Sequence, residues 1–194
     1  MAVITGAAQG VGYACAQRIG SEGGRIVVAD LAKGPANEAV QTLGDLGIEA
    51  IAVCADLSVA GAADEVMACA QEKFGRLDVV VNNVGGTIWM KPFWHYEADE
   101  IRQEVERSFW PIMWTAHAAV RAMKKNGGAI VNIGSNAVDG VYRVPYSACK
   151  GAVAAMTTAI AAEAVDLNIR VNCVALGGTT APERKTPRLA RAKT

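Results

Sequence analysis

Three residues in the C-terminal half of the chain could carry acid–base chemistry together. Tyr146 and Lys150 are four positions apart, so in a helix they share one face. Ser135 lies eleven residues before Tyr146. A phenol with an ordinary pKa of about 10 is a weak base at pH 7, but an ammonium about 4 Å away lowers that pKa by roughly three units. We predict Tyr146 as the catalytic acid/base, Lys150 as the activating cation and Ser135 as a donor to the substrate oxygen.

A Tyr and a Lys at this spacing most often lie on a solvated helix face. The surrounding sequence favours a site instead. The segment Asn132-Ile133-Gly134-Ser135 ends an apolar run, and Tyr146 opens the next helical pattern. In open α/β sheets, ligands bind at the carboxyl ends of the strands. The catalytic interpretation therefore requires that the neighbouring elements form such a sheet.

Strand and helix patterns alternate along the chain. Short β-branched runs predict strands at residues 3–5, 25–29, 48–53, 77–81, 129–133 and 169–174. Helical patterns lie between them, at residues 10–22, 34–46, 60–74, 101–124 and 145–167. The strand runs are continuously apolar, as in a sheet that helices cover on both faces. The alternation predicts an α/β fold with a doubly wound parallel sheet in three layers, α/β/α, and a single domain over residues 1–194.

A glycine-rich segment could bind phosphate groups. The segment TGAAQGVG begins at Thr5, where the first expected strand turns into the first expected helix. Glycines let the backbone approach a pyrophosphate, and a helix N-terminus offers unpaired N–H groups and the positive end of its dipole. A plain tight turn is the alternative. We predict a dinucleotide site in this turn, with cofactor contacts from Gly6, Gln9, Gly10, Val11 and Gly12.

Asp30 indicates which dinucleotide binds. It follows the second expected strand, 18 residues after Gly12. A carboxylate there can accept hydrogen bonds from both ribose hydroxyls of the adenosine half. It also repels a 2′-phosphate by roughly 1–4 kcal/mol per charge pair, and no Arg or Lys in the glycine turn or directly after Asp30 offsets that repulsion. The expected cofactor is NAD; the alternative is that Asp30 only caps a turn or helix.

Composition narrows the class of partner. The chain has 194 residues and a formal net charge of zero, which removes the electrostatic reason to expect nucleic acid or an anionic membrane. Its longest uncharged apolar stretch, residues 151–162, is shorter than the ~20 residues of a membrane span. No basic segment typical of a signal peptide precedes the glycine turn. We therefore expect a small-molecule substrate and a cytoplasmic protein.

Cysteine and histidine usage argues against a metal site. The five cysteines are scattered and contain no C-x-x-C pair, as expected of buried thiols in a reducing compartment. No carboxylate or cysteine stands at metal-ligand spacing around His95 or His117. The sequence therefore predicts no metal.

Together these motifs resemble those of the classical short-chain dehydrogenase/reductase family. The resemblance rests on the glycine turn, Asn82-Asn83-Val84-Gly85, Ser135 and the Tyr146-x-x-x-Lys150 pair, and it covers nearly the whole chain. It implies a Rossmann sheet, an NAD-dependent oxidoreductase and hydride transfer at a secondary alcohol carbon. A homo-oligomer, either a dimer or a tetramer, is also expected.

The same resemblance implies further cofactor contacts and shows departures from the family pattern. Asp56-Leu57 matches the family's adenine-contacting dipeptide, and Asn82 and Gly85 match cofactor-side positions after the fourth strand. Ser108 stands where the family has a proton-relay asparagine. The chain also ends before the family's last helix and strand and has only four residues before Thr5. We therefore expect a domain clipped at both ends, and a catalytically idle NAD-binding module is one alternative.

Other segments resemble the benzoate cis-diol dehydrogenases within this family. They are Asn83 to Trp89, Lys91-Pro92-Phe93, Arg143 to Tyr146 and Gly177-Gly178-Thr179, with Ser108 in place of the asparagine. This resemblance implies oxidation of a 1,2-dihydroxycyclohexa-3,5-diene-1-carboxylate to catechol with decarboxylation, in aromatic-acid degradation. The alternatives are another short-chain alcohol or dihydrodiol dehydrogenase, or a 3-oxoacyl reductase.

A carboxylate on the substrate would need a cation, because desolvating an unpaired charge opposes binding. Arg143 lies three residues before Tyr146, and its guanidinium could grip a carboxylate with two hydrogen bonds. We predict Arg143 as a substrate-binding residue. A surface arginine that pairs with Asp139 is the alternative, and Lys91 and the basic residues within 183–194 are rival cations.

Overall fold

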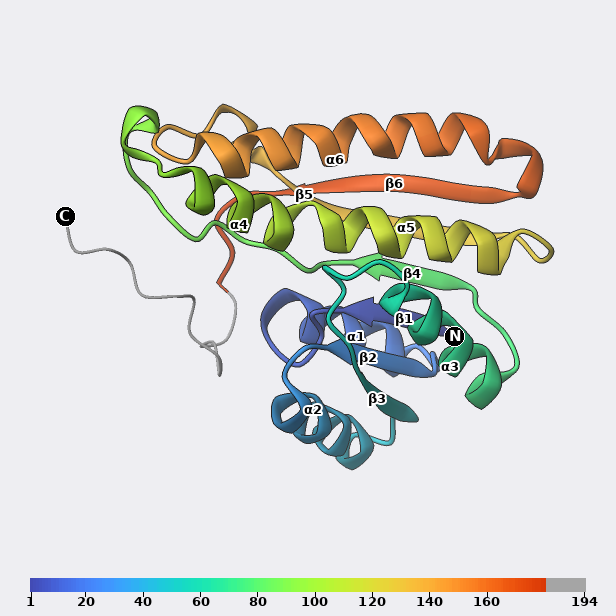
Figure 1. The fold of residues 1–194 in the computed structure, drawn as a ribbon. Helices are drawn as coiled ribbons and strands as arrows, with labels where there is room; N and C mark the ends of the chain where they lie inside the picture. Colours follow the sequence, from blue (N-terminus) through green and yellow to red (C-terminus); the bar gives the residue numbers. More distant parts are fainter. Residues whose placement is uncertain (181–194) are drawn as a thin grey trace.

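Six parallel strands form one sheet in the order β3-β2-β1-β4-β5-β6. The computed structural model describes residues 1–180. The strands are β1 (Ala2–Thr5), β2 (Ile26–Asp30), β3 (Ala50–Cys54), β4 (Val79–Asn82), β5 (Gly128–Ser135) and β6 (Ile169–Leu176). The chain builds outward from β1 to β3 and then returns to β4 on the other side of β1 (Figure 1). This reversal confirms the doubly wound parallel sheet.

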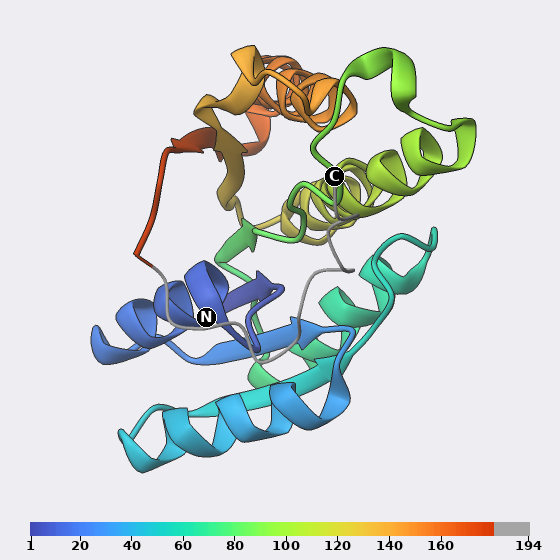
Figure 2. The same ribbon diagram turned by 90° about the vertical axis from the view of Figure 1, so that its left-hand side faces the viewer.

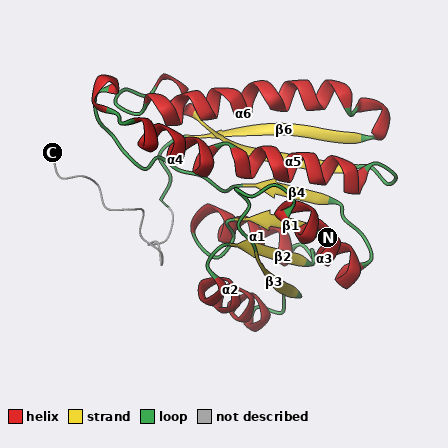
Figure 3. Cartoon of the chain, in the orientation of Figure 1, coloured by secondary structure: helices red, strands yellow, loops and turns green. Residues whose placement is uncertain are grey.

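Helices connect the strands and cover the sheet (Figure 3). They are α1 (Gly10–Ser21), α2 (Lys33–Asp45), α3 (Ala62–Phe74), α4 (Ala98–Ser108), α5 (Trp110–Met123) and α6 (Val144–Glu163), with 3-10 turns η1 (Phe93–His95), η2 (Asn136–Asp139) and η3 (Val165–Leu167). In both ribbon views α6 lies at one end of the molecule, beside β6, and α2 lies at the other (Figures 1 and 2). Within residues 1–180, no helix has the length and apolar content to cross a membrane.

Two buried hydrophobic clusters lie on opposite faces of the sheet. One packs α3, α5 and η3 against Val3, Val27 and Ile130, and the other packs α1 and α2 against Ile4 and Val28. Adjacent strand residues thus point to opposite faces, and both faces of β1 and β2 are buried. This explains why those strands are continuously apolar.

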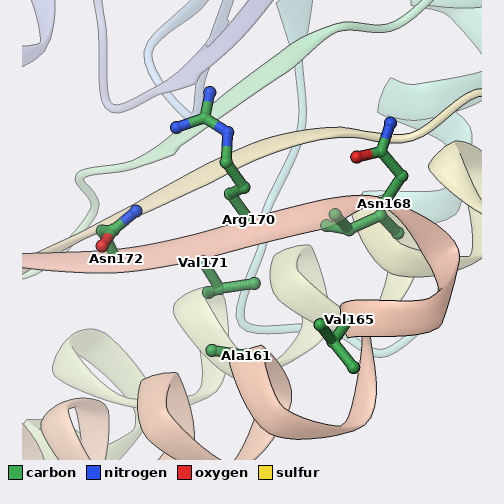
Figure 4. A pocket seen from close by; sticks show the side chains of 7 residues that line it. Ala161, Val165, Asn168, Arg170, Val171 and Asn172 are labelled. Atoms are coloured by element: carbon green, nitrogen blue, oxygen red, sulfur yellow. The ribbon is translucent and has the colours of Figure 1, made fainter.

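The strand β6 departs from that pattern. Ile169 and Val171 are buried on the side of α6, whereas Arg170 is exposed. Figure 4 shows Arg170 and Val171 projecting to opposite faces of the strand. Among the described helices, α1 and α2 pack on the half of the sheet that holds β1, β2 and β3. The second outer layer therefore covers that half, and the polar residues of β6 lie beyond it.

The expectation of one helix over residues 101–124 is wrong. The segment forms α4 and α5, which are separated at Phe109, where φ is −121°. Pro111 lies in the first turn of α5. Proline lacks an N–H, and its ring clashes with the carbonyl four residues earlier, so a continuous helix would be strained here. The break leaves the end of α4 directly beside the cleft described below.

Candidate active site

One cleft of about 820 Å³ lies at the carboxyl ends of the strands. It spans the point where the strand order reverses, between β1 and β4, as expected for a ligand site in a doubly wound sheet. Its volume falls in the range typical of small-molecule and cofactor sites. Its wall includes most of the predicted residues, namely Gly6, Gln9, Gly10, Val11, Asp30, Asp56, Leu57, Gly85, Ser135, Tyr146 and Lys150.

The glycine turn joins β1 to α1 at one end of the cleft. Gly6 has a φ of +61°, which a residue with a side chain rarely adopts. Gly12 is buried and lies outside the wall of the cleft. A Cβ on Gly12 would collide with the carbonyl oxygen of Gly6 and stand 2.6 Å from Nδ2 of Asn83. Gly12 therefore allows α1 to pack closely on the strands, and Gly6, Gln9, Gly10 and Val11 face the cleft.

Asp30 ends β2 and links the glycine turn to the start of α2. Its Oδ2 accepts a hydrogen bond from the Ala8 amide at 3.1 Å, and its Oδ1 accepts one from the Ala32 amide at 3.0 Å. The carboxylate is thus positioned by two backbone donors while it lines the cleft. Each carboxylate oxygen can accept a second hydrogen bond. The turn-stabilising role and a ribose-binding role are therefore compatible.

The paired asparagines at the end of β4 occupy different environments. Asn82 is fully buried, and its Nδ2 donates to Oδ1 of Asn132 at 2.8 Å, so its side chain lies inside the sheet layer. Asn83 lines the cleft, and its Nδ2 donates to the carbonyls of Thr5 and Gly6 at 3.0 and 3.1 Å. Adjacent residues at a strand end point in opposite directions. The wall residue at this point is therefore Asn83, and Asn82 holds β4 to β5.

Asp56 and Leu57 follow β3 and also line the cleft. Leu57 is buried, with 4% of its surface exposed. The Asp56 carboxylate accepts hydrogen bonds from the amide and the hydroxyl of Ser58 at 3.0 and 2.6 Å. These contacts fix the loop between β3 and α3 beside the cleft.

Ser135, Tyr146 and Lys150 come together at the other end of the cleft. Ser135 ends β5, and Tyr146 and Lys150 lie in the first turns of α6. The Ser135 hydroxyl accepts a hydrogen bond from the Ala137 amide at 3.0 Å, which leaves its proton available to a substrate oxygen. Nζ of Lys150 lies 5.8 Å from the centre of the Tyr146 ring. The three groups predicted from the sequence therefore share one site.

Lys150 is a buried cation. Only 3% of its surface is exposed, and its Nζ donates to the Ile133 carbonyl at 2.7 Å. Burial lowers the pKa of Lys150 to about 8, and interactions with Cys173, Cys149 and Glu104 partly oppose that shift. Near pH 7 the ammonium form therefore persists, but close to its titration range.

Two candidate cations for a substrate carboxylate have different surroundings. Arg143 precedes α6 and is not among the residues that line the cleft. A Cβ on Gly140 would stand 2.8 Å from its Nε, so the side chain lies against that loop. Lys91 forms an ion pair with Glu100 at 2.5 Å. Arg107, which sequence reasoning missed, does line the cleft.

Glu104 and Ser108 form a buried polar pair on α4 that sequence reasoning also missed as a unit. Glu104 is 1% exposed and Ser108 is fully buried, and the Ser108 hydroxyl donates to Oε1 of Glu104 at 2.7 Å. Their spacing of four residues, on the face that α4 presents to the core, was the available signal. A carboxylate at such a position indicates a partner or a function.

A second hollow of about 510 Å³ lies between β6 and the end of α6 (Figure 4). Its only ionisable side chain is Arg170, so it lacks the acid–base pairing of the cleft. Within residues 1–180, no three His, Cys, Asp or Glu side chains gather closely enough to hold a metal ion.

Known proteins share this arrangement. A family described as short chain dehydrogenase matches residues 1–191. A 1,6-dihydroxycyclohexa-2,4-diene-1-carboxylate dehydrogenase from Pseudomonas putida is 49% identical over 185 residues, which cover 93% of this chain and 67% of the relative. The chain thus spans about two thirds of that relative's length.

Solved structures match the fold as well. The 3-ketoacyl-(acyl-carrier-protein) reductase from Brucella melitensis, complexed with NADH, has a TM-score of 0.87 and 28% identity, covering 93% of this chain and 76% of that chain. An actinorhodin polyketide ketoreductase with NADPH has a TM-score of 0.88 and 28% identity, covering 93% of this chain and 71% of that chain. Both structures hold a nicotinamide cofactor. The chain is therefore an oxidoreductase that belongs to the short chain dehydrogenase family.

Proposed function

We propose that the chain oxidises a cis-dihydrodiol carboxylate, of the 1,2-dihydroxycyclohexa-3,5-diene-1-carboxylate type, with NAD. The observation that carries the proposal is the single cleft that joins the glycine turn and Asp30 to Ser135, Tyr146 and Lys150. Such a cleft suits a dinucleotide at one end and a small alcohol at the other. The name of the Pseudomonas putida relative supports the choice of substrate.

The residues of the cleft fit a dinucleotide without a 2′-phosphate. The close approach of the Gly12 and Gly6 backbones seats the start of α1 against the turn, so a pyrophosphate bound there would meet the helix N-terminus. Asp30 would accept the ribose hydroxyls and repel a phosphate. In the described part of the chain, two basic residues line the cleft, Arg107 on α4 and Lys150 on α6. Neither belongs to the segment after β2 that carries Asp30. These features favour NAD over NADP.

The catalytic roles follow from the geometry of the polar groups. Tyr146 would remove the proton of the reacting hydroxyl as general base. Lys150, held by the Ile133 carbonyl, would stabilise the phenolate with its charge. Ser135 would donate its free proton to the substrate oxygen. A bound NAD supplies the hydride acceptor at the carbinol carbon.

Oxidation of the secondary alcohol next to the carboxylate-bearing carbon gives a β-keto acid. That acid loses carbon dioxide by breaking the bond between the ring and its carboxylate, and the resulting enol is catechol. The ring becomes aromatic in this step, which drives it forward. Overall, one diol carboxylate and one NAD⁺ give catechol, carbon dioxide and NADH, because the enolate left by loss of carbon dioxide takes up the proton that the alcohol released.

Arg143 is our proposed ligand for the substrate carboxylate. It directly precedes the helix that carries Tyr146, and its buried Nε has no hydrogen-bond partner within residues 1–180. A guanidinium N–H without a partner gains a hydrogen bond if a carboxylate arrives. This role requires the side chain to turn from Gly140 toward Ser135.

The decisive experiment measures NADH and catechol together after the purified chain is mixed with the diol acid and NAD. We expect equal yields of the two products. Tyr146→Phe should bind NADH with unchanged affinity and turn over at least ~100-fold more slowly, as for the loss of a general base. NADH binding without any turnover by the unsubstituted chain would instead indicate an idle cofactor-binding module.

A further inference from the structure

A carboxylate is buried directly behind the proposed catalytic residues. Glu104 on α4 is 1% exposed. Its Oε2 accepts a hydrogen bond from the Ile88 amide at 2.8 Å, and its Oε1 accepts one from the Ser108 hydroxyl at 2.7 Å. Both donors are neutral, so neither cancels its charge. A buried carboxylate is costly to maintain, which makes its position informative.

The pair formed by Glu104 and Ser108 is in contact with the segment that faces Lys150. The Gly86 amide donates to the Ser108 hydroxyl at 3.3 Å. The point where a Cβ on Gly85 would stand is 3.5 Å from Nζ of Lys150 and 3.5 Å from Cα of Ser108. The glycine at position 85 therefore lets the end of α4 and the Lys150 ammonium approach each other closely. The helices α4 and α6 pack together around this point.

The charges that face Lys150 come from three elements. They are Glu104 on α4, Cys149 and the Tyr146 ring on α6, and Cys173 on β6. Burial raises the pKa of Cys149 to about 11, so this thiol is neutral at pH 7. Thiols in general carry little charge at that pH. Glu104 is the carboxyl group among these side chains.

The groups on the other side of Glu104 do not cancel its charge. Tyr96 faces it, and burial together with Glu104 and Glu100 raises the pKa of this phenol. Glu100 is itself paired with Lys91, at 2.5 Å. Because Glu104 is 1% exposed, solvent screens its interactions only weakly.

We propose that Glu104 is a positioning residue for catalysis, which keeps Lys150 protonated through its charge and holds the Gly86–Ile88 segment through Ser108. The inference rests on the proposed function in one respect, because it assumes that Lys150 stabilises the phenolate of Tyr146. Ser108 stands where the short-chain dehydrogenase family has an asparagine. In this chain the Ser108 hydroxyl is hydrogen-bonded to the Glu104 carboxylate. Glu104 itself is not required to touch the substrate.

The charge effect can be measured on Lys150 without turnover. In protein labelled with ¹³C-lysine, the Cε signal of Lys150, assigned with Lys150→Arg, reports its titration. Glu104→Gln removes the charge and keeps the shape, so we expect the titration midpoint of Lys150 to fall, as for the loss of an opposite charge. Glu104→Met is a second neutral variant, of similar length, if the Gln variant does not fold.

Two control variants separate charge from packing. Glu104→Asp keeps the charge, so the Lys150 midpoint should stay near that of the unsubstituted protein. Ser108→Ala keeps the charge but breaks the bridge, so it should lower turnover at every pH without moving the midpoint. An unchanged or raised midpoint in both neutral variants overturns the inference. An equal fall in the Asp and Gln variants also overturns it, because packing would then be the cause.

The pH profile of diol oxidation separates this inference from the proposed function. In Glu104→Gln, we expect the fold-loss of activity to be small well below the Lys150 midpoint and to grow as pH rises through it, because the variant loses the ammonium at a lower pH. If the unsubstituted chain oxidises the diol acid but the midpoint does not move, the function stands and the inference fails. If the midpoint falls but no diol acid is oxidised at any pH, the electrostatic role of Glu104 stands and the proposed function fails.

Discussion

Replacing Lys150 with methionine tests the buried cation through protein stability. Lys150 is 3% exposed, and its Nζ donates a hydrogen bond to the Ile133 carbonyl. Methionine has a similar length and no charge, so Lys150→Met removes the titration while filling most of the same space. The informative quantity is not the stability of the variant at one pH. It is the difference in unfolding free energy between the two proteins as pH changes.

The direction and size of that difference follow from the pKa of Lys150. Burial lowers this pKa from 10.5 to about 8 in the folded chain. Between these values the unfolded chain holds a proton that the folded chain has released, so the unfolding free energy rises with pH. The shift corresponds to about 3 kcal/mol of unfolding free energy, which the unsubstituted protein gains as pH rises from about 8 to 10.5. Below about pH 8 this gain is absent. Lys150→Met should not show this gain.

Urea unfolding of the cofactor-free proteins at several values between pH 7 and 10.5 measures the effect. Cys149, whose pKa burial raises from 9.0 to about 11, destabilises the folded state above pH 9 in both proteins, so its contribution largely cancels in the difference. The difference between unsubstituted protein and variant should grow with pH by about 3 kcal/mol. A flat difference would refute the reasoning that Lys150 is held as a desolvated cation.

Two further predictions concern the two ends of the cleft. Asp30→Ala should weaken NAD binding and reduce the discrimination against NADP, because ribose hydrogen bonds and phosphate repulsion are lost together. Fluorescence titration with each cofactor measures both affinities. An equal loss of affinity for NAD and NADP would mean that Asp30 serves only its contacts with Ala8 and Ala32. Arg143→Met should raise KM for the diol acid by about 10-fold or more but matter much less for a neutral dihydrodiol, as for the loss of a charge-assisted hydrogen bond. Equal effects on both diols would mean that Arg143 shapes the loop at Gly140.

The sheet and most of the cleft were predictable because their determinants are local. Apolar β-branched runs and the glycine turn fix β1, β2 and the approach of α1. Parallel strands end on one edge, so residues as distant as Asp30 and Ser135 had to meet there. The spacing of Tyr146 and Lys150 added the last two groups once α6 was placed.

The rest depended on contacts that periodicity does not encode. The helical pattern over residues 101–124 was continuous, but Pro111 divides it, and only the observed break shows α4 ending beside the cleft. The hidden partner of Ser108 was missed because a glutamate on a helix is usually solvated. The separation of Asn82 from Asn83 depends on the face that each presents, and a shift of one residue reverses that face.

The interior of this protein carries two charges that folding alone does not need. An ammonium at Lys150 and a carboxylate at Glu104 each lose hydration on burial, and replacing buried charges with apolar groups of similar volume is often neutral or stabilising. Here they lie on two packed helices, α6 and α4, and Glu104 opposes part of the lowering that burial causes in the Lys150 pKa. The two groups form no ion pair with each other, so in the proposed mechanism the ammonium, which donates to the Ile133 carbonyl, can still stabilise the Tyr146 phenolate. A fold built only for stability would place methionine or leucine at both positions. The charges are therefore best explained by the chemistry proposed for the cleft, with Lys150 set close to its titration range and Glu104 placed to keep it charged.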